Sequence, residues 1–252
     1  MKEYITLAQK STFTMDDVAS LAGNRSTAAS QVSRLMKHGL VAKIRNNLYT
    51  CINAVDGQPV ASKYQIGSAI TESSYISHHS ALSFMGLTGQ VFYEVYVSTP
   101  RRFNDFAFDG ITYRCVASKF AEGVVAPPYT RDIRMTSLER TVIDSIKDVE
   151  RIGGIEELLT ALSSIRSLDE GELIRFLDAY DIKFLFQKTA FLLSHYQDSL
   201  RLSPSFFAYC RARMGKSTRY LTKGSTQYVS SWQLVVPPDL FALAGQGGGS
   251  DA

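Results

Sequence analysis

The chain has 252 residues, of which 45% are hydrophobic and 20% charged; this is an ordinary globular balance that excludes bulk disorder. Its length allows two domains, and no apolar run approaches the roughly 18 residues that a membrane span needs. The net charge of +3 is unevenly placed, because residues 1–53 hold seven Lys and Arg against three acids, or +4, which leaves −1 for the remainder. Basic charge concentrated near the amino terminus favours a polyanionic partner there.

The first ten residues and the cysteines bear on the compartment. The opening stretch MKEYITLAQK lacks the apolar core of a signal peptide, so a cytoplasmic location without membrane association is expected. Cys51, Cys115 and Cys210 are odd in number and widely separated. Buried free thiols, rather than a disulfide framework or a zinc site, are therefore expected.

The stretch Phe13–Cys51, FTMDDVASLAGNRSTAASQVSRLMKHGLVAKIRNNLYTC, has the pattern of a winged helix-turn-helix. Thr14 is a good N-cap for a short helix that ends at Gly23, and Ser26 is the expected N-cap of the next helix. A turn of three or four residues would set these two helices near a right angle. The second helix is predicted to be the recognition helix, and its expected apolar side consists of Ala29, Val32, Leu35 and Met36.

After Gly39, residues 40–45 and 48–51 have the composition of two strands, and Asn46-Asn47 suits the tight turn between them. This hairpin would be the wing. The polar face of the recognition helix and the cations of the wing are expected to meet DNA. The predicted DNA-binding residues are Arg25, Ser26, Thr27, Ser30, Gln31, Arg34, Lys43, Arg45, Asn46 and Asn47. The alternative is a winged helix with a structural or protein-docking role, whose polar face is merely solvated.

The middle of the chain is predicted to be a small α+β unit. Turn-rich residues 53–59 mark a boundary, helices are expected over 60–70 and 75–85, and VFYEVYVST from Val91 suits a buried strand. Residues 106–108 and 111–116 flank an Asp-Gly turn signal, and a strand at 133–135 precedes a helix over 138–146. If the loop after this first strand lies near the hairpin, a second basic surface for DNA, RNA or a toxin would result, although a solvated loop and strand edge is the favoured interpretation. Its members would be Arg101, Arg102, Arg114 and Lys119.

The carboxy-terminal part is predicted to be helical at 155–165, 167–180, 184–193 and from Ser203, with a strand pair within 219–236. The fold class is therefore α+β. The expected domains are a winged helix at 1–53 and an α+β domain at 60–242, whose α/β part spans about 60–150 and whose helical part spans about 151–242. A flexible tail is expected at 243–252.

The sequence offers little support for catalysis. Adjacent His78 and His79 point about 100° apart on a helix, so a core or capping role is favoured over metal binding. The acidic pairs at 156–157 and 169–170 lie near helix starts, where carboxylates stabilise the dipole. Gly215-Lys216-Ser217 lacks the glycine five residues earlier that a phosphate-binding loop needs, because Cys210 stands there. No enzyme activity, cofactor or metal is predicted.

Four blocks resemble the AbiEi family of antitoxins, the DNA-binding halves of bacterial type IV toxin–antitoxin operons. They are the winged-helix segment up to Thr50, SYISHHSALSFMGL (Ser74 to Leu87), VFYEVYVST, and LERTVIDSI (Leu138 to Ile146). Their order carries the resemblance more than any one block, and the similarity extends to about residue 200.

The resemblance implies an autorepressor that binds inverted repeats in its own promoter and a second domain that counters a nucleotidyltransferase-fold toxin, in operons of the abortive-infection type that serve phage defence. It implies that Ser26, Thr27, Gln31 and Arg34 contact DNA bases and that Lys43 and Arg45 contact phosphate. The family pattern has Arg-Gly at the wing tip, where this chain has Asn46-Asn47. An RNA- or nucleotide-processing enzyme, or a protein-interaction module built on a winged-helix scaffold, is the alternative.

Overall fold

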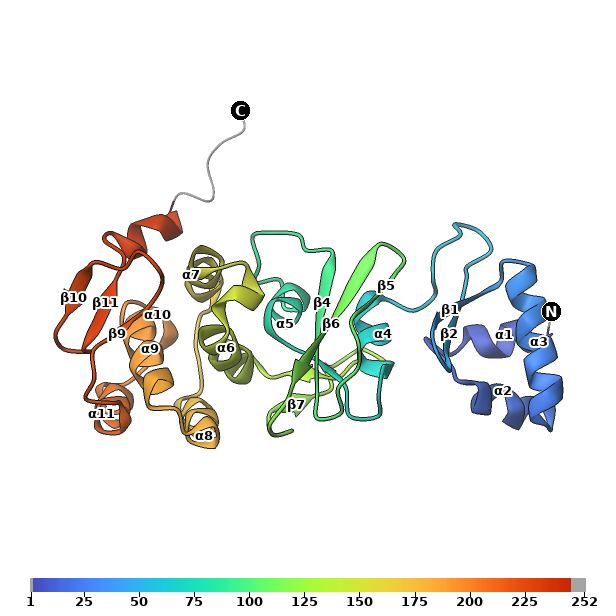
Figure 1. The fold of residues 1–252 in the computed structure, drawn as a ribbon, viewed down its shortest axis with the longest axis horizontal. Helices are drawn as coiled ribbons and strands as arrows, with labels where there is room; N and C mark the ends of the chain where they lie inside the picture. The colour runs from blue at the N-terminus through green and yellow to red at the C-terminus, as the bar shows by residue number, and fades with distance from the viewer. Residues whose placement is uncertain (1, 246–252) are drawn as a thin grey trace, which may run out of the picture. The chain divides into compact units, whose positions relative to one another are not determined.

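A computed structural model describes residues 2–245 of the chain (Figure 1). Its elements form a mixed α+β fold, in agreement with the predicted fold class. The chain groups into two units that do not follow the sequence in blocks: the first comprises the chain up to Ile76 and Phe92–Met135, and the second comprises Ser77–Val91 and the chain from Thr136 onward.

The first unit begins with three helices and a hairpin. These are α1 (Lys2–Ala8), α2 (Met15–Ala22), α3 (Arg25–Lys37), β1 (Val41–Arg45) and β2 (Leu48–Cys51), with the two strands antiparallel. Helix α2 packs against α3, α3 against β1, and α1 against β2. The predicted helices and hairpin of this segment are therefore present.

The helix ends follow from local chemistry, with one difference from the prediction. Thr14 forms a capping box with Asp17, and Gly23 adopts a left-handed φ of 83° that ends α2. Ser26 is not the N-cap of α3: Asn24 takes that position, and its Oδ1 accepts the Thr27 amide at 2.8 Å. Asparagine caps as well as serine does, and the left-handed turn at Gly23 places Asn24 directly before the helix. The turn is thus shorter than predicted.

Burial raises the pKa of the Asp17 carboxyl, but this effect is outweighed by hydrogen bonds from Lys10 and from the backbone and hydroxyl of Thr14. The pKa of Asp17 is consequently below its usual value, and the carboxylate that completes the capping box stays ionised at neutral pH.

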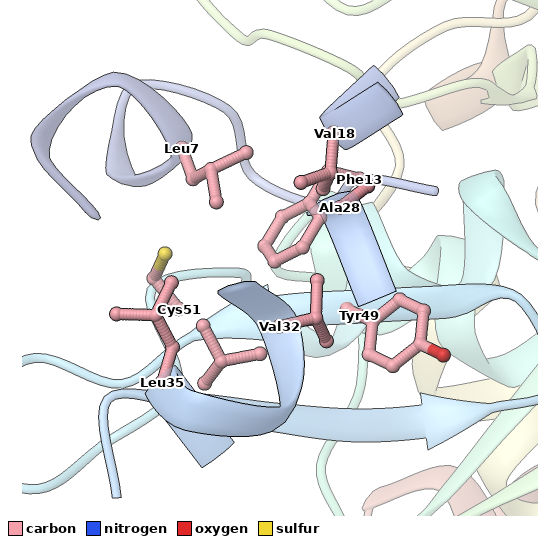
Figure 2. Packing of buried hydrophobic residues seen from close by; sticks show 9 residues of the cluster. Leu7, Phe13, Val18, Ala28, Val32, Leu35, Tyr49 and Cys51 are labelled. Atoms are coloured by element: carbon pink, nitrogen blue, oxygen red, sulfur yellow. The ribbon is translucent and has the colours of Figure 1, made fainter. Parts of the chain in front are cut away.

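A single apolar core holds these elements together (Figure 2). The rings of Phe13 and Tyr49 stack at 5.8 Å between centroids, next to the side chains that α2 and α3 turn inward. Each fully buried Val or Leu stabilises such a core by about 1.5–3 kcal/mol. The buried members are Leu7, Phe13, Val18, Ala28, Val32, Leu35, Val41, Tyr49 and Cys51.

The inward face of α3 differs from the prediction by part of a turn. Val32 and Leu35 are buried as expected, but Ala28 takes the place predicted for Ala29, which is exposed. Met36 is 40% exposed. Because the helix begins at Arg25, positions 28, 32 and 35 face the hairpin, and the neighbouring positions rotate toward solvent.

The rest of the first unit is built on a six-stranded sheet of order β5-β6-β4-β3-β8-β7. Strands β4 and β6 are parallel, whereas β5 with β6 and β3 with β4 are antiparallel. The predicted Asp109-Gly110 turn joins β5 to β6, and both residues have positive φ. The elements are α4 (Lys63–Ala69), β3 (Tyr75–Ile76), β4 (Glu94–Thr99), β5 (Phe106–Phe108), β6 (Ile111–Ala117), β7 (Val124–Val125) and β8 (Met135–Thr136).

Two predictions for this part are wrong. Residues 75–85 do not form one helix, because Tyr75–Ile76 pairs with β4 and β8 before a helix begins at His78. The strand expected from Val91 begins at Glu94, and Val91 and Tyr93 are exposed. Short segments of this kind take their structure from the sheet they join, which local periodicity does not reveal.

The second unit is mainly helical. In place of the predicted strand pair there is a three-stranded sheet of order β10-β11-β9. The tail was predicted from residue 243, but η2 continues to Gly245. Residues 246–252 of the predicted tail lie outside the described part of the chain. The elements of the second unit are α5 (His78–Phe84), α6 (Leu138–Lys147), η1 (Val149–Ile152), α7 (Ile155–Ser164), α8 (Glu170–Tyr180), α9 (Lys183–Ser194), α10 (Gln197–Leu200), α11 (Pro204–Arg213), β9 (Arg219–Tyr220), β10 (Gln227–Val229), β11 (Leu234–Val236) and η2 (Leu240–Gly245).

An ion pair lies inside this second unit. Arg140 Nε donates to Asp144 Oδ1 at 2.9 Å, both side chains are 2% exposed, and the Tyr180 hydroxyl donates to the same carboxylate oxygen at 2.5 Å. Burial, followed by the Asp144 charge, raises the pKa of Tyr180 far above its usual value. The i,i+4 spacing in α6 predicts the pair, but its burial depends on α8.

Candidate nucleic-acid interface

The face of α3 opposite the core is polar. Ala28, Val32 and Leu35 are buried, and this fixes the rotation of the helix. With 3.6 residues per turn, the predicted residues Ser26, Ser30 and Arg34 then lie on the opposite side of the helix, and Thr27 and Gln31 lie at its flank. Ser26, Thr27, Ser30 and Arg34 are exposed and Gln31 is half-buried. These are side chains with the donors and acceptors that base edges and phosphates require.

The charge around this face has one sign. No Asp or Glu occurs between Asp17 and Asp56, a span that includes α3 and the hairpin. Arg25 lies 3.4 Å from Asp16, with both side chains about 70% exposed, so the pair is weak and screened by salt. The cations within the span are Arg25, Arg34, Lys37, Lys43 and Arg45.

A shallow hollow of about 650 Å³ follows the second half of α3. Arg34 and Ser30, both predicted, lie in its wall, whereas Ser33, Lys37 and His38 were not predicted. The signal for these three was present, because Lys37 and His38 follow Arg34 by three and four residues and Lys37 follows Ser33 by four. The basic face therefore extends to the end of α3.

The hairpin holds the predicted wing residues in different ways. Lys43 and Asn46 are exposed. Asn47 has a φ of 57°, and its Oδ1 accepts the backbone amide of Met15 at 3.0 Å. Asn47 thus ties the turn of the hairpin to the start of α2, which makes it a positioning residue for Lys43 and Asn46.

Arg45 lies apart from this basic face. Its guanidinium carbon lies 5.4 Å from the ring centroid of Phe103 and 5.3 Å from that of Phe106. The residue is half-buried, and Nη1 is buried without a hydrogen-bond partner among the described residues. The prediction that Arg45 grips phosphate together with Lys43 therefore does not fit its environment in the structure.

A shift in strand register explains the separation of Lys43 from Arg45. Lys43 pairs with Tyr49 and Arg45 with Leu48, so the strand has an irregularity between the two cations. Regular alternation would put positions 43 and 45 on the same face, whereas a bulge turns the following side chain.

The second basic surface predicted for the first unit is only partly present. Strands β4 and β6 are parallel with Thr99 opposite Ala117, so the segments after them leave the same end of the sheet. Exposed Arg101, Arg102 and Lys119 lie on those segments.

Arg114 does not belong to this surface. Its guanidinium donates to Glu94 Oε1 at 2.6 and 2.9 Å and to Asp105 Oδ2 at 3.2 Å. These hydrogen bonds, Glu94 first, raise its pKa. The two carboxylates neutralise Arg114, which was named as a member of the second basic surface.

The histidine pair is buried in the second unit, in keeping with a core role. His78 Nδ1 lies 2.9 Å from Ser77 Oγ, and its Nε2 lies 3.4 Å from Asp148 Oδ2. Glu157 is also buried and accepts the amides of Gly89 and Gln90, which is a structural role.

The residues that commonly bind metals do not form a metal centre within residues 2–245. No group of three or more His, Cys, Asp or Glu side chains in this range is placed to hold a metal ion. The three cysteines are free, and Cys51 and Cys210 are buried as predicted, whereas Cys115 is half-buried. Burial raises the pKa of Cys51 to about 11 and that of Cys210 to about 12. Within the same described range, no helix is long and apolar enough to cross a bilayer.

Comparison with known proteins gives a likeness of fold. No family model and no curated protein matches the chain. Among solved structures, the chain is similar to the crystal structure of the Rv2827c protein from Mycobacterium tuberculosis, with a TM-score of 0.67 and 13% sequence identity. The match covers 96% of this chain and 91% of that one, so the likeness extends over nearly the whole length.

Proposed function

We propose that the first three helices and hairpin form a winged helix-turn-helix that binds double-stranded DNA, with α3 as its recognition helix. The observation that carries the proposal is the face of α3 itself: Ser26, Thr27, Ser30 and Arg34 are exposed together on a helix without acids. A helix with such a face fits the major groove, where side chains can meet base edges.

The roles of individual residues follow from their chemistry. Arg34 has the planar guanidinium that pairs with the O6 and N7 atoms of guanine, and Thr27 and Ser30 can bond base edges or phosphates. Lys43 on the hairpin and Lys37 at the end of α3 supply phosphate contacts on either side. Asn46 is exposed in the hairpin turn beside Asn47, whose Oδ1 is occupied by the Met15 amide.

In the cell, we propose that this protein is an antitoxin that represses its own operon at inverted repeats and counteracts a nucleotidyltransferase-fold toxin. The proposal is supported by the order of the four sequence blocks that resemble AbiEi antitoxins, combined with the basic face of α3. DNA binding serves the autorepression, and the remainder of the chain serves the neutralisation.

The DNA-binding proposal is tested by fluorescence anisotropy with DNA from upstream of the chain's own coding sequence, across a salt series. A scrambled duplex of equal length measures non-specific binding. Replacing Arg34 by Ala is expected to weaken specific binding by about 1–3 kcal/mol, or roughly 5- to 150-fold. Arg166→Ala, at an exposed arginine of the second unit, is the matched control and should bind like the wild type. Unchanged affinity of a folded Arg34→Ala protein would remove α3 from the interface.

The antitoxin proposal has a separate test. The neighbouring reading frames are expected to include a nucleotidyltransferase-fold protein that arrests growth when expressed alone. Co-expression of the chain should restore growth, and the Arg34→Ala variant should restore it equally under an unrelated promoter. Absence of such a neighbour, or arrest that the chain does not relieve, would contradict the antitoxin assignment and leave DNA binding standing.

A further inference from the structure

A pocket of about 310 Å³ lies within the second unit, where the start of α9 meets the segment between α11 and β9. Its volume is at the lower end of the range typical of small-molecule sites. The polar and aromatic side chains of its wall are Lys183, Phe184, Gln187, Ser217 and Arg219.

The amino terminus of α9 forms part of the pocket wall, and no side chain at the N-cap position accepts a hydrogen bond from its first amides. The N-cap residue is Ile182, which has no side-chain hydrogen bond to offer, and the first turn holds no acid. Most helices satisfy their first amides with Ser, Thr, Asp or Asn, and an uncapped terminus with its partial positive charge attracts anions. Here Lys183 adds a full positive charge at the first position of the helix.

Gln187 lies one turn further along α9 and is 1% exposed. Its Nε2 donates to the carbonyls of Trp232 at 2.6 Å and Gln233 at 2.9 Å, and these two bonds fix which end of the amide is the oxygen. Oε1 is left buried with no hydrogen-bond partner among the described residues. A buried acceptor of this kind calls for a donor from outside the chain.

The surroundings of the pocket are basic. Arg219 extends across Phe184, with its guanidinium carbon 4.9 Å from the ring centroid. No acid occurs between Asp198 and Asp239, and the acid beside the helix start, Asp181, lies 3.9 Å from Arg213. No acidic side chain is therefore part of the pocket wall, as far as the described residues go.

We propose that this pocket binds a phosphate ester of nucleotide size. The phosphate would lie at the first turn of α9, between Lys183, Arg219 and the Ser217 hydroxyl, and a hydroxyl or amino group of the same ligand would donate to Gln187 Oε1. Gly215-Lys216-Ser217 is not a phosphate-binding loop in itself, but its Ser217 faces a helix start supplied by another element. The proposal is independent of the DNA-binding face on α3.

The test uses isothermal titration of the full-length chain with nucleoside monophosphates, the corresponding nucleosides and inorganic phosphate. Trp232, the one tryptophan of the chain, gives a second readout, because its carbonyl accepts from Gln187 and its fluorescence should change on binding. At least one nucleotide is expected to bind at least about tenfold more tightly than its nucleoside or inorganic phosphate, since each of these can satisfy only half of the site.

Matched variants separate the pocket from general surface charge. Arg219→Gln should weaken nucleotide binding by about tenfold, and Ser217→Ala should weaken it by a smaller factor. Lys216→Gln removes the same charge from an exposed neighbour that is not in the pocket wall, and should leave binding unchanged. The proposal is overturned if no nucleotide binds, if inorganic phosphate binds as tightly as the nucleotides, or if Lys216→Gln weakens binding as much as Arg219→Gln.

Discussion

Arg45 and Lys43 are two cations of one hairpin strand with different surroundings, and replacing each by Gln should affect different properties. Lys43 is exposed, whereas Arg45 packs on Phe103 and Phe106. We expect Arg45→Gln to lower the stability of the first unit while leaving DNA affinity nearly unchanged, and Lys43→Gln to do the reverse.

The size of the stability effect follows from the contacts of Arg45. A guanidinium over an aromatic ring contributes about 0.5–1 kcal/mol at an exposed site and about 2 kcal/mol when desolvated. Arg45 has two such rings, at 5.4 and 5.3 Å, and is half-buried. Its buried Nη1 has no hydrogen-bond partner among the described residues, and this offsets part of the gain. A net loss of about 1–2 kcal/mol is therefore expected for Arg45→Gln.

Two assays separate the effects. Urea unfolding followed by circular dichroism measures the free energy of unfolding, and anisotropy titration over a salt series measures the slope of log K against log salt. Lys43→Gln should reduce the magnitude of that slope by about 1, the loss of one phosphate contact, with stability unchanged. Arg45→Gln should keep the slope of the wild type.

The contrary result would be an Arg45→Gln variant with unaltered stability and a salt slope reduced as in Lys43→Gln. Such a result would mean that the guanidinium leaves the two rings and contacts phosphate in the complex. Loss of both stability and slope in Lys43→Gln would equally contradict the placement of Lys43 as a solvated side chain.

Three further predictions concern a helix cap, the packing around a glycine and a buried charge. Asn24→Ala should destabilise the first unit by about 1 kcal/mol in urea unfolding, whereas Ser26→Ala should not, since Asn24 caps α3; equal losses would contradict this. Gly67→Ala should cost about 1–3 kcal/mol, because a Cβ there would lie 2.6 Å from Ile76 Cδ1. Burial lowers the pKa of Lys188 from 10.5 to about 8, so the unfolded chain binds the extra proton between these values and stability rises with pH across them. The unfolding free energy of the wild type minus that of Lys188→Met should thus increase by about 1–3 kcal/mol from pH 8 to 10.5, and a constant difference would refute the buried charge.

Features that depend on a few neighbouring residues were predictable from the sequence. The Thr14 cap and the Gly23 stop rest on local hydrogen bonds and backbone preference, and both are present. The Asp109-Gly110 turn likewise needs only two residues that tolerate positive φ. The cap of α3 was predicted at Ser26 and is Asn24 instead, because asparagine caps a helix as well as serine does and follows directly on the left-handed turn at Gly23.

Features that depend on distant partners were not predictable. The sequence around Tyr75–Ile76 has the pattern of a helix, but these two residues form a strand because their backbone pairs with β4 and β8. The pocket beside Gln187 needs α9 and the segment before β9 to meet, although the two are about thirty residues apart in sequence. The charge pattern and the periodicity of a sequence do not predict such contacts between distant segments.

The basic residues between Asp17 and Asp56 show how far charge counting can locate a nucleic-acid interface. Counting charges gives Arg34, Lys43 and Arg45 equal weight, and a distant polyanion is indeed attracted by the total positive charge of the three. A base or phosphate in contact responds only to cations that can reach it. The rotation of α3 leaves Arg34 solvated, and the register shift in β1 turns Arg45 toward two aromatic rings. Specificity should therefore depend on α3, while Lys43 alone carries the contribution of the hairpin strand to affinity.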